Sequence, residues 1–574
     1  MRIRRSSGGL SVNAIAGTGV VMLGLDLTDA VRAGCLGFAI RRERMDTGEI
    51  EWLRGMKSFE LTQDDGSDTE GFRSNKHPIQ SFQWADYLAR PDTEYRFRVT
   101  AMYGTPAALV EGPTVSVDVR TEREIADTTQ GQKHSVFFNR GAAASQAYAR
   151  RFNNKYPDDP IQGPGYNAAY KWLSRGLHES LMNFLARATD NTFSLRAAIY
   201  EFEWKWTLEA FRDAANLRNV DVQVVYDAID AKTAKDNREA VADVGIGNLC
   251  RERTQGTIMH NKFVVLLKNN VPVAVWTGST NQTENGIFGH SNVGHIVDDP
   301  AIAAKYLDYW TELIKDQADI DQWVETNNPC PTFPLQAPLT AVFSPHIGED
   351  VLKLYATIAD NARKALFMTF AFGMNKRFQT VYEKEAGLPR AQRKVINFAL
   401  MEKEGNGSGL AKGKIDVARI RRRSNVIVAL GNRIKMNRFD RWVQEMPKPT
   451  RNAGVLWVHT KYMLVDPLGN NPVVVTGSAN FSGASTYDNH ENMLIIQGDQ
   501  RTADIYLGEF MRLHSHYAFR ETVANQAVWN NNQPEWRPQF LIPDDTWQNG
   551  GYFVPGEERF MKRKYFAGKA SDVN

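Results

Sequence analysis

The chain has 574 residues, of which 42% are hydrophobic, and its formal net charge is only +3. The length predicts two to four domains with ordinary globular cores, and the balanced charge excludes a general affinity of the whole surface for polyanions. The three cysteines, Cys35, Cys250 and Cys330, lack metal-ligand spacing and are too few for a disulfide framework, which fits a reducing compartment.

Hydropathy places the chain outside the membrane. No run reaches the roughly 18 apolar residues that a membrane-spanning helix needs. Residues 6–25 are apolar only in patches, interrupted by Asn13 and several glycines, so a secretory signal is not expected. We therefore expect a cytoplasmic protein, and one that acts on lipid would have to approach its membrane peripherally.

Residues 1–125 differ from the rest of the chain. Short apolar or alternating runs, among them 20–25, 95–101 and 115–119, are separated by turn-rich stretches, which predicts an all-β sandwich. The stretch 88–99, Leu-Ala-Arg-Pro-Asp-Thr-Glu-Tyr-Arg-Phe-Arg-Val, resembles the tyrosine-corner region of a fibronectin type III domain. Such domains bind or brace, so we expect this region to dock the protein or position its substrate.

The most informative pattern is a pair of matching clusters that begin 199 residues apart. In both clusters the distance from His to Lys is two residues and the distance from His to Asn is twenty-one. Equal spacing and similar apolar flanks indicate duplicated halves. The catalytic candidates in the two clusters are His260, Lys262 and Asn281, and His459, Lys461 and Asn480.

These residue types suit the cleavage of a phosphodiester. Side chains two apart on a strand point to the same face, so each His and its Lys project together. Two lysines and two asparagines supply hydrogen-bond donors where negative charge grows on the phosphoryl oxygens. One imidazole can act as the nucleophile when neutral and the other as the general acid when protonated. We expect no cofactor and no metal, because the lysines can stabilise the charge.

The clusters resemble the signature of the phospholipase D superfamily, which is His-x-Lys, four residues, Asp, then Gly-Ser and Asn. The second cluster matches in full, with Asp466 and Ser478, whereas the first has Ser279 but carries Leu267 where the Asp is expected. The resemblance covers about residues 134–520. It implies an α/β fold in which two phospholipase D-like αβα halves share one active site and cleave phosphodiesters through a phosphohistidine.

The superfamily also places an acid beyond the Asn, which orients a histidine. Glu491 fits in the second half, and its ungapped equivalent is Asn292, although matching His290 to His490 would put Ser291 there. A carboxylate favours imidazolium. If Glu491 pairs with His459, then His459 is the general acid and His260 the nucleophile, which agrees with the superfamily's use of a first-half nucleophile.

These features predict three regions. Residues 1–125 form the fibronectin type III-like sandwich, residues 126–330 form the first phospholipase D-like half, and residues 331–574 form the second half with a C-terminal wrapping segment. Nothing in the sequence indicates an oligomeric state.

A local basic stretch suggests where a substrate is held. Residues 412–451 contain twelve Lys and Arg residues but only three Asp and Glu, with Phe439 and Trp442 interleaved. This pattern favours contact with a nucleic-acid backbone and stacking on its bases, although anionic phospholipid or pairing with acidic segments of the chain would also suit it. The candidate substrate-binding residues are Arg421, Arg422, Arg423, Arg433 and Lys435.

The sequence thus leads to a metal-independent nuclease as the favoured hypothesis. A phospholipase D or phosphatidyl transferase that acts on phospholipid is the first alternative. A catalytically degenerate module that binds phosphate without cleaving it is the second, because Leu267 and Asn292 depart from the pattern. The intact His, Lys and Asn pairs argue against degeneration.

Overall fold

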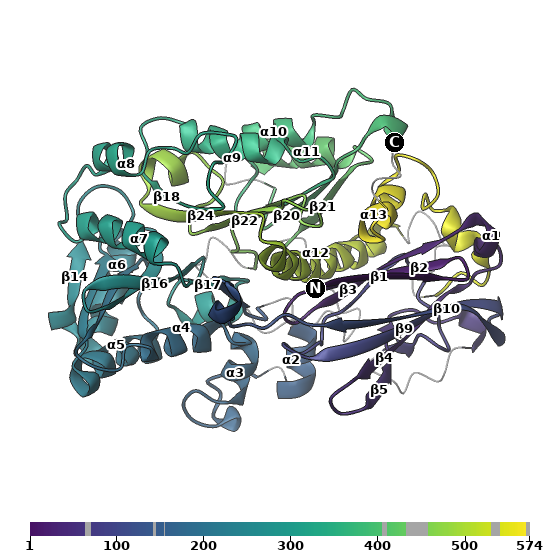
Figure 1. Cartoon of the computed structure of the whole chain (residues 1–574), viewed down its shortest axis with the longest axis horizontal. Coiled ribbons are helices and arrows are strands. Elements are labelled where there is room, and N and C mark those ends of the chain that lie inside the picture. Colours follow the sequence, from purple (N-terminus) through teal and green to yellow (C-terminus); the bar gives the residue numbers. More distant parts are fainter. Residues whose placement is uncertain are drawn as a thin grey trace.

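The structure, a computed structural model, describes residues 1–62, 71–141, 145–153, 155–404, 410–431, 457–529 and 540–569. An all-β N-terminal region lies beside two α/β halves, as Figure 1 shows. The long helix α12 (Gln500–Trp529) runs through the middle of the molecule, between the second half and the N-terminal sheets. The expected fold class, an all-β region followed by two α/β halves, is confirmed.

The N-terminal region consists mainly of two antiparallel sheets, with strand orders β1-β2-β3-β8 and β10-β9-β4-β5. The backbone N–H of Arg90 donates to the hydroxyl of Tyr95 at 2.9 Å, a hydrogen bond of the kind that defines a tyrosine corner. The fibronectin type III-like identity of this region stays a prediction. Its elements are β1 (Arg2–Ser7), β2 (Leu10–Ala16), β3 (Val21–Leu27), α1 (Asp29–Arg32), β4 (Gly37–Arg44), β5 (Glu49–Trp52), β6 (Arg54–Gly55), β7 (Phe72–Arg73), β8 (Gln83–Asp86), β9 (Glu94–Thr105) and β10 (Ala108–Arg120).

The first half is built on a mixed sheet with the order β11-β17-β16-β15-β12-β13-β14. Helices α2 (Ser145–Phe152) and α3 (Ala168–Ser174) precede the covering helices α4 (Leu177–Ala186), α5 (Lys205–Arg218), α6 (Ala231–Val244) and α7 (Pro300–Leu313). The strands are β11 (His134–Phe138), β12 (Phe193–Ile199), β13 (Asp221–Asp227), β14 (Cys250–Arg253), β15 (Lys262–Lys268), β16 (Val271–Gly278) and β17 (Val293–Val297).

The second half repeats this topology strand for strand, with the order β18-β24-β23-β22-β19-β20-β21. Helix α8 (Asp321–Asn327) precedes it, and α9 (Asp350–Asp360), α10 (Lys376–Tyr382) and α11 (Leu410–Arg421) cover it together with α12. The strands are β18 (Leu339–Ser344), β19 (Ala365–Phe370), β20 (Ile396–Met401), β21 (Val426–Leu430), β22 (Tyr462–Val465), β23 (Val473–Gly477) and β24 (Glu491–Gln497). The duplication inferred from the motifs therefore extends to the whole sheet.

The central strands are apolar on both faces because helices cover both sides of each sheet. Strand β15, Lys-Phe-Val-Val-Leu-Leu-Lys, is buried from its first residue to its sixth. Its runs of Val and Leu favour a buried strand rather than a surface strand with alternating polarity. Burial from both sides keeps the two ends of the strand rigid, and the first of these ends carries Lys262.

The equivalent helices α7 and α12 join the two halves. Tyr306 and Trp310 on α7 belong to the same buried cluster as Tyr506 and Phe510 on α12, together with strand residues from both sheets. Helix α7 contacts β16 of its own sheet and β18 of the other sheet, and α12 contacts β22 of its own sheet and β11 of the other. This shared core sets the position of one half relative to the other.

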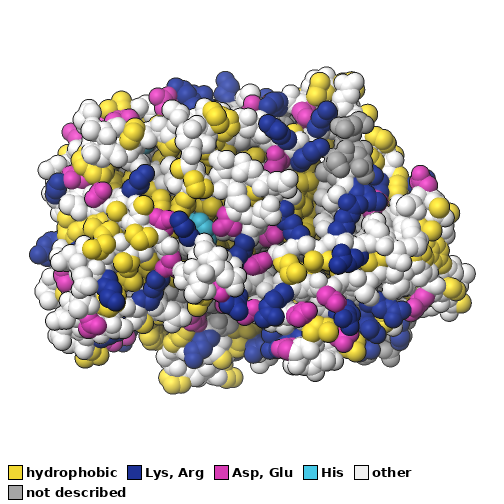
Figure 2. All heavy atoms as spheres, in the orientation of Figure 1, with side chains coloured by type: hydrophobic (Ala, Val, Ile, Leu, Met, Phe, Trp, Pro, Cys, Tyr) yellow, Lys and Arg dark blue, Asp and Glu magenta, His cyan; other side chains and the backbone are white. Residues whose placement is uncertain are grey.

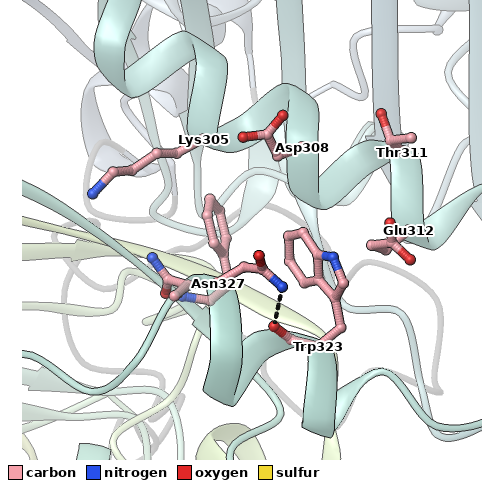
Figure 3. Close-up of a pocket in the computed structure, with 8 residues that line it drawn as sticks. Lys305, Asp308, Thr311, Glu312, Trp323 and Asn327 are labelled. Carbon is pink, nitrogen blue, oxygen red and sulfur yellow. Dashed lines mark hydrogen bonds between the residues drawn. The ribbon is translucent and has the colours of Figure 1, made fainter.

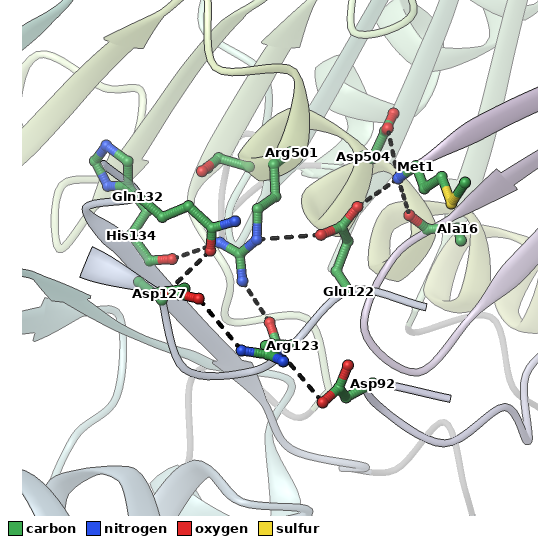
Figure 4. Close-up of polar contacts among 12 residues, drawn as sticks. Met1, Ala16, Asp92, Glu122, Arg123, Asp127, Gln132, His134, Arg501 and Asp504 are labelled. Carbon is green, nitrogen blue, oxygen red and sulfur yellow. Dashed lines mark hydrogen bonds and ion pairs between the residues drawn. The ribbon is translucent and has the colours of Figure 1, made fainter. Parts of the chain in front are cut away.

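The N-terminal region is attached to both halves by ion pairs and by the C-terminal segment. Arg501 on α12 donates to the carbonyl of His134 at 2.7 Å and pairs with Glu122 at 3.2 Å (Figure 4). The indole of Trp547 lies in the core of the N-terminal region and donates to the carbonyl of Cys35 at 2.8 Å. Helix α13 (Glu558–Phe566) packs on β3. The wrapping segment thus lies against the N-terminal sandwich as well as the second half.

Candidate active site

The two motif histidines lie just before the equivalent strands β15 and β22, and the backbone there is joined across the halves. The N–H of His260 donates to the carbonyl of His490 at 2.9 Å, and the N–H of Ser291 donates to the carbonyl of Trp457 at 2.7 Å. Two parallel bridges, Met259 with His490 and Ser291 with Val458, complete the pattern. Each motif is therefore anchored by the other half of the chain.

The side-chain partners of the histidines are also crossed. Both carboxylate oxygens of Glu491 lie 2.9 Å from Nδ1 of His260, while the amide oxygen of Asn292 lies 2.9 Å from Nδ1 of His459. The expectation that Glu491 pairs with His459 is wrong. Asn292, rather than Ser291, is the equivalent of Glu491. Each immediately precedes the residue whose carbonyl accepts from the backbone N–H of the motif serine, Val293 for Ser279 and Asn492 for Ser478.

These partners determine which ring nitrogen faces the substrate. The Asn292 amide accepts from Ser279 Oγ at 2.7 Å and donates to the carbonyl of Gly286 at 2.7 Å, which orients its oxygen toward His459. A carboxylate and an amide oxygen can only accept, so Nδ1 carries the proton in both rings. In the neutral form, Nε2 of His260 and Nε2 of His459 each keep a lone pair for chemistry.

The two lysines are almost completely buried beside the histidines. Lys262 and Lys461 are each 1% exposed, and each ammonium donates to the carbonyl of the histidine two residues earlier, at 2.6 Å. Burial lowers the pKa of Lys262 to about 8, although Glu491 and Glu201 oppose this change. Burial, and then the charge of Lys262, lower the pKa of Lys461 well below its ordinary value. An anion that enters the site restores the charge on both lysines.

Burial also keeps the histidines neutral in the free protein. It lowers the pKa of His260 to about 4, and the carboxylate of Glu491 limits the fall. The pKa of His459 is lowered by burial and then by the charges of Lys461 and His290. The charges of Lys262 and His260 in the first half also lower the pKa of His459 in the second half. The two half-sites are therefore close enough to interact electrostatically.

The Gly-Ser pairs bring two strands unusually close together. A Cβ on Gly278 would lie 2.1 Å from the carbonyl oxygen of Val293, and a Cβ on Gly477 would lie 2.2 Å from that of Asn492. The following Ser478 accepts from the N–H of Asn492 at 2.9 Å. Glycine is therefore required where the two strands approach each other. Asn281 and Asn480 follow these glycines and lie just beyond the ends of β16 and β23.

Asp466, the Asp of the motif, lies away from the histidines. Its carboxylate accepts from the backbone N–H groups of Arg363, Lys364 and Ala365 at 2.7–2.9 Å and thereby holds the start of β19. Its equivalent, Leu267, is buried in the core. The departure at Leu267 therefore leaves His260, Lys262 and Asn281 in place.

A second pair of acids supports the motifs, and the sequence analysis did not identify it. Asp227, at the end of β13, accepts from the N–H of Met259 at 2.8 Å. Its equivalent Glu402, just after β20, accepts from the N–H of Val458 at 2.9 Å. Each acid fixes the residue before a catalytic histidine. The sequence does contain a signal for these acids, because each half has an acid at or just after the end of the same strand, β13 or β20.

The first half contributes two more residues that the sequence analysis did not assign to the site. The ring of Tyr200 lies 4.9 Å from that of His260 and 5.0 Å from the ammonium of Lys262, measured from its centroid. Glu201 accepts from the side-chain amide of Asn281 at 2.6 Å. Neither residue is repeated in the second half, so comparing the halves by sequence did not reveal them.

The predicted substrate-binding residues are only partly described. Arg421 forms a bidentate ion pair with Glu521 on α12, with both distances 2.6 Å, so its charge is used inside the protein. This is the internal pairing considered as an alternative for the basic stretch. Arg422 is exposed and Arg423 half-buried, while Arg433 and Lys435 lie outside the described residues. A substrate contact through these residues stays a prediction.

A surface pocket of about 400 Å³ lies between α7 and α8 (Figure 3). Lys305, Asp308 and Trp323 line it, and none of the predicted site residues does. Among the described residues, no group of three or more His, Cys, Asp or Glu side chains could hold a metal ion, and no helix is long and apolar enough to cross a membrane. The expected metal independence stays a prediction.

Comparisons with solved structures find distant relatives. A polyphosphate kinase from Porphyromonas gingivalis is 13% identical with a TM-score of 0.36; the match covers 56% of this chain and 43% of the kinase. A phosphatidylserine synthase from Haemophilus influenzae is 11% identical with a TM-score of 0.40, covering 62% and 91%. Yeast tyrosyl-DNA phosphodiesterase is 14% identical with a TM-score of 0.33, covering 56% and 85%. No curated protein matches the sequence.

The family comparison is more direct. Residues 181–314 and 421–514 match the family model described as cardiolipin synthase, PLD-like domain. The first segment contains His260, Lys262 and Asn281, and the second contains the equivalent residues, as well as Glu491. Both segments lie within the repeated sheets that bring the two motifs together. Two segments of this chain, one in each α/β half, therefore match the PLD-like domain family.

Proposed function

We propose that the chain is a phosphodiesterase in which His260 is the nucleophile and His459 the general acid and base. The observation that carries this assignment is the crossed pairing of His260 with Glu491 and of His459 with Asn292. When Nε2 of His260 bonds to phosphorus while Nδ1 keeps its proton, the ring becomes cationic. The carboxylate of Glu491 stabilises that cation, whereas the neutral amide of Asn292 cannot do so to the same degree.

The first chemical step forms a phosphohistidine. Nε2 of His260 attacks phosphorus, the bond from phosphorus to the leaving oxygen breaks, and Nε2 of protonated His459 gives its proton to that oxygen. Binding of the anionic diester raises the pKa of His459, which burial holds low in the free protein, so the ring is protonated in the complex.

The second step restores the enzyme. Nε2 of His459, now neutral, takes a proton from water as the oxygen of that water attacks phosphorus. The bond between phosphorus and His260 breaks and its electron pair returns to Nε2. The buried ammonium groups of Lys262 and Lys461 stabilise the charge on the phosphoryl oxygens in both steps, because charges act strongly in a site that excludes water.

Nucleic acid is the substrate class that we favour, on the basis of the basic stretch. Figure 2 shows Lys and Arg side chains gathered over the part of the second half that contains α11 and β21. Arg422, which is exposed, belongs to this region. Phosphate contacts of this kind supply most of the affinity for a nucleic-acid backbone and make that affinity fall with salt.

Trapping the intermediate tests the mechanism. Purified protein is mixed with bis(p-nitrophenyl) phosphate in the presence of EDTA, quenched at high pH to preserve phosphohistidine, and mapped by mass spectrometry. We expect the adduct on His260, and no adduct in a His260→Ala variant. An adduct on His459 reverses the roles, and the absence of both cleavage and adduct favours the phosphate-binding module.

A substrate panel tests the class. Labelled single-stranded DNA, double-stranded DNA and RNA, and vesicles that contain phosphatidylglycerol, are incubated beside His260→Ala. We expect cleavage of nucleic acid that His260→Ala abolishes and that an Arg422→Glu variant weakens most at low salt. Cleavage of vesicle lipid alone rejects the nuclease in favour of the phospholipase alternative.

A further inference from the structure

The two half-sites differ at one buried charged position. Register places Ala197 opposite Val264 in the first sheet and Met368 opposite Met463 in the second. Val264 and Met463 each lie four residues after their motif histidine. Ala197 therefore corresponds to Met368. Counting four residues onward, Glu201 corresponds to Phe372. At this position, therefore, the first half has a carboxylate and the second half has an apolar ring.

Glu201 contacts the motif amide of its own half-site, that of Asn281. Its Oε2 accepts from Nδ2 of Asn281 at 2.6 Å, and Gln282, the next residue, donates its backbone N–H to the carbonyl of Glu201 at 3.0 Å. Within the described part of the chain, Oδ1 of Asn281 is buried without a hydrogen-bond partner. The orientation of the Asn281 amide therefore depends on Glu201, whose carboxylate holds the amide nitrogen.

Glu201 also acts electrostatically on both lysines. Its charge raises the pKa of Lys262 and of Lys461, and these lysines in turn lower the pKa of Glu201, which burial raises. Outside the site, the charge of Lys232 lowers the pKa of Glu201, and the charge of Glu201 raises the pKa of Glu203. With the two lysines charged and with Glu201 and Glu491 ionised, these four charges sum to zero.

We propose that Glu201 is a positioning residue that orients Asn281 and makes the site select a singly charged phosphodiester over a doubly charged phosphate. This inference rests on the proposed phosphodiesterase function and names a residue that determines its specificity. Without Glu201 the four-charge balance becomes positive, and a dianion gains about twice as much attraction as a monoanion. With Glu201, the phosphomonoester that hydrolysis produces is bound less tightly than it would otherwise be, so it leaves the site readily.

The test compares two anions of different charge in the full-length chain. Sulfate is a dianion throughout pH 6 to 9 and dimethyl phosphate is a monoanion, so neither titrates during the experiment. Each is used as a competitive inhibitor of bis(p-nitrophenyl) phosphate cleavage at constant ionic strength. In Glu201→Gln we expect the inhibition constant of sulfate to fall about tenfold, and that of dimethyl phosphate to fall much less.

Three further variants separate charge from structure. Glu203→Gln removes a neighbouring acid that does not bind Asn281, and we expect it to keep the discrimination of the wild type. Glu201→Asp keeps the charge but shortens the reach to Asn281, so we expect unchanged sulfate inhibition and a lower kcat. Phe372→Glu adds a carboxylate at the equivalent position of the second half, and we expect weaker sulfate binding. Phe372→Glu also provides a test if Glu201→Gln does not fold.

Thermal unfolding with each anion gives a readout independent of catalysis. We expect sulfate to raise the Tm of Glu201→Gln more than that of the wild type. An unchanged ratio of sulfate to dimethyl phosphate inhibition in Glu201→Gln overturns the inference, as does an unchanged sulfate-dependent Tm. If the wild type cleaves no diester, the proposed function fails, whereas the Tm comparison still decides whether Glu201 sets the charge preference.

Discussion

The carboxylate of Glu491, in the second half of the chain, lies 2.9 Å from Nδ1 of His260 in the first half. This contact crosses the boundary between the duplicated sheets, and the contact of Asn292 with His459 crosses it in the other direction. Neither half can therefore form a complete histidine site alone. We propose that this asymmetry between carboxylate and amide gives the two chemically similar histidines different roles.

Changing the charge of the side chain that partners each histidine should therefore have different effects on catalysis. In Glu491→Gln we expect kcat for a p-nitrophenyl diester to fall about 10²- to 10⁴-fold, because the cationic ring of phosphorylated His260 loses its counter-charge. The matched variant Asn292→Asp adds a carboxylate opposite His459 and should shift the pH profile of kcat upward by raising that histidine's pKa. Wild-type kcat in Glu491→Gln would argue that Glu491 has only a structural role.

Removing His459 should affect substrates according to their leaving groups. In His459→Ala we expect the first step to survive with p-nitrophenolate, which leaves without a proton, and the phosphohistidine on His260 to accumulate because no base activates water. Alkyl leaving groups should lose several further orders of magnitude. Rapid-quench burst amplitudes measure this, with His260→Ala as the control that shows no burst. Equal losses with both leaving groups are inconsistent with general acid catalysis by His459.

The buried lysines predict how activity changes with pH. Lys262 stabilises the phosphoryl charge only when protonated, and burial lowers its pKa to about 8 in the free protein. Its protonated fraction falls as pH rises through that value, so kcat/KM should fall above about pH 8 rather than near the ordinary pKa of lysine, about 10.4. In Lys262→Arg, whose guanidinium stays charged, the lower residual activity should no longer fall in that range. A wild-type profile that is flat to pH 10 contradicts this assignment.

Asp466 should contribute to stability and not to chemistry. Its carboxylate accepts from three consecutive backbone N–H groups at the start of β19. We expect Asp466→Ala to lower the free energy of unfolding by about 1–3 kcal/mol, because these N–H groups lose their partner. Denaturant unfolding measures the change. The matched control is Asp360→Ala, which removes an exposed ion pair with Lys384 and should cost at most about 1 kcal/mol. A large loss of kcat in folded Asp466→Ala would assign it to the site.

The glycines before the motif serines should not tolerate a side chain. A Cβ on Gly477 would lie 2.2 Å from the carbonyl oxygen of Asn492, which forces β23 and β24 apart. We expect Gly477→Ala to cost about 3 kcal/mol or more and to displace Asn480 from the site, so that kcat falls as well. Gly247→Ala, where the added Cβ meets no atom within 4 Å, should be nearly neutral in both measurements. Equal stability of the two variants contradicts this account.

The sequence determined the chemistry of each half-site. The spacing of His260, Lys262 and Asn281, repeated at His459, reflects strand periodicity and a turn of fixed length, which are local properties. Matching the two halves also limited the first-half equivalent of Glu491 to Asn292 or Ser291.

Only the tertiary structure decided which partner serves which histidine. Glu491 and Asn292 follow their own motifs in the chain, and strands β24 and β17, which begin at or just after them, pair within their own sheets. The residue before each, His490 or Ser291, nevertheless bridges to the opposite half. No spacing within one half encodes that crossing, because it depends on how the α7 and α12 core orients the sheets. Comparing the two motifs does not reveal Glu201, because the second half has Phe372 at the equivalent position.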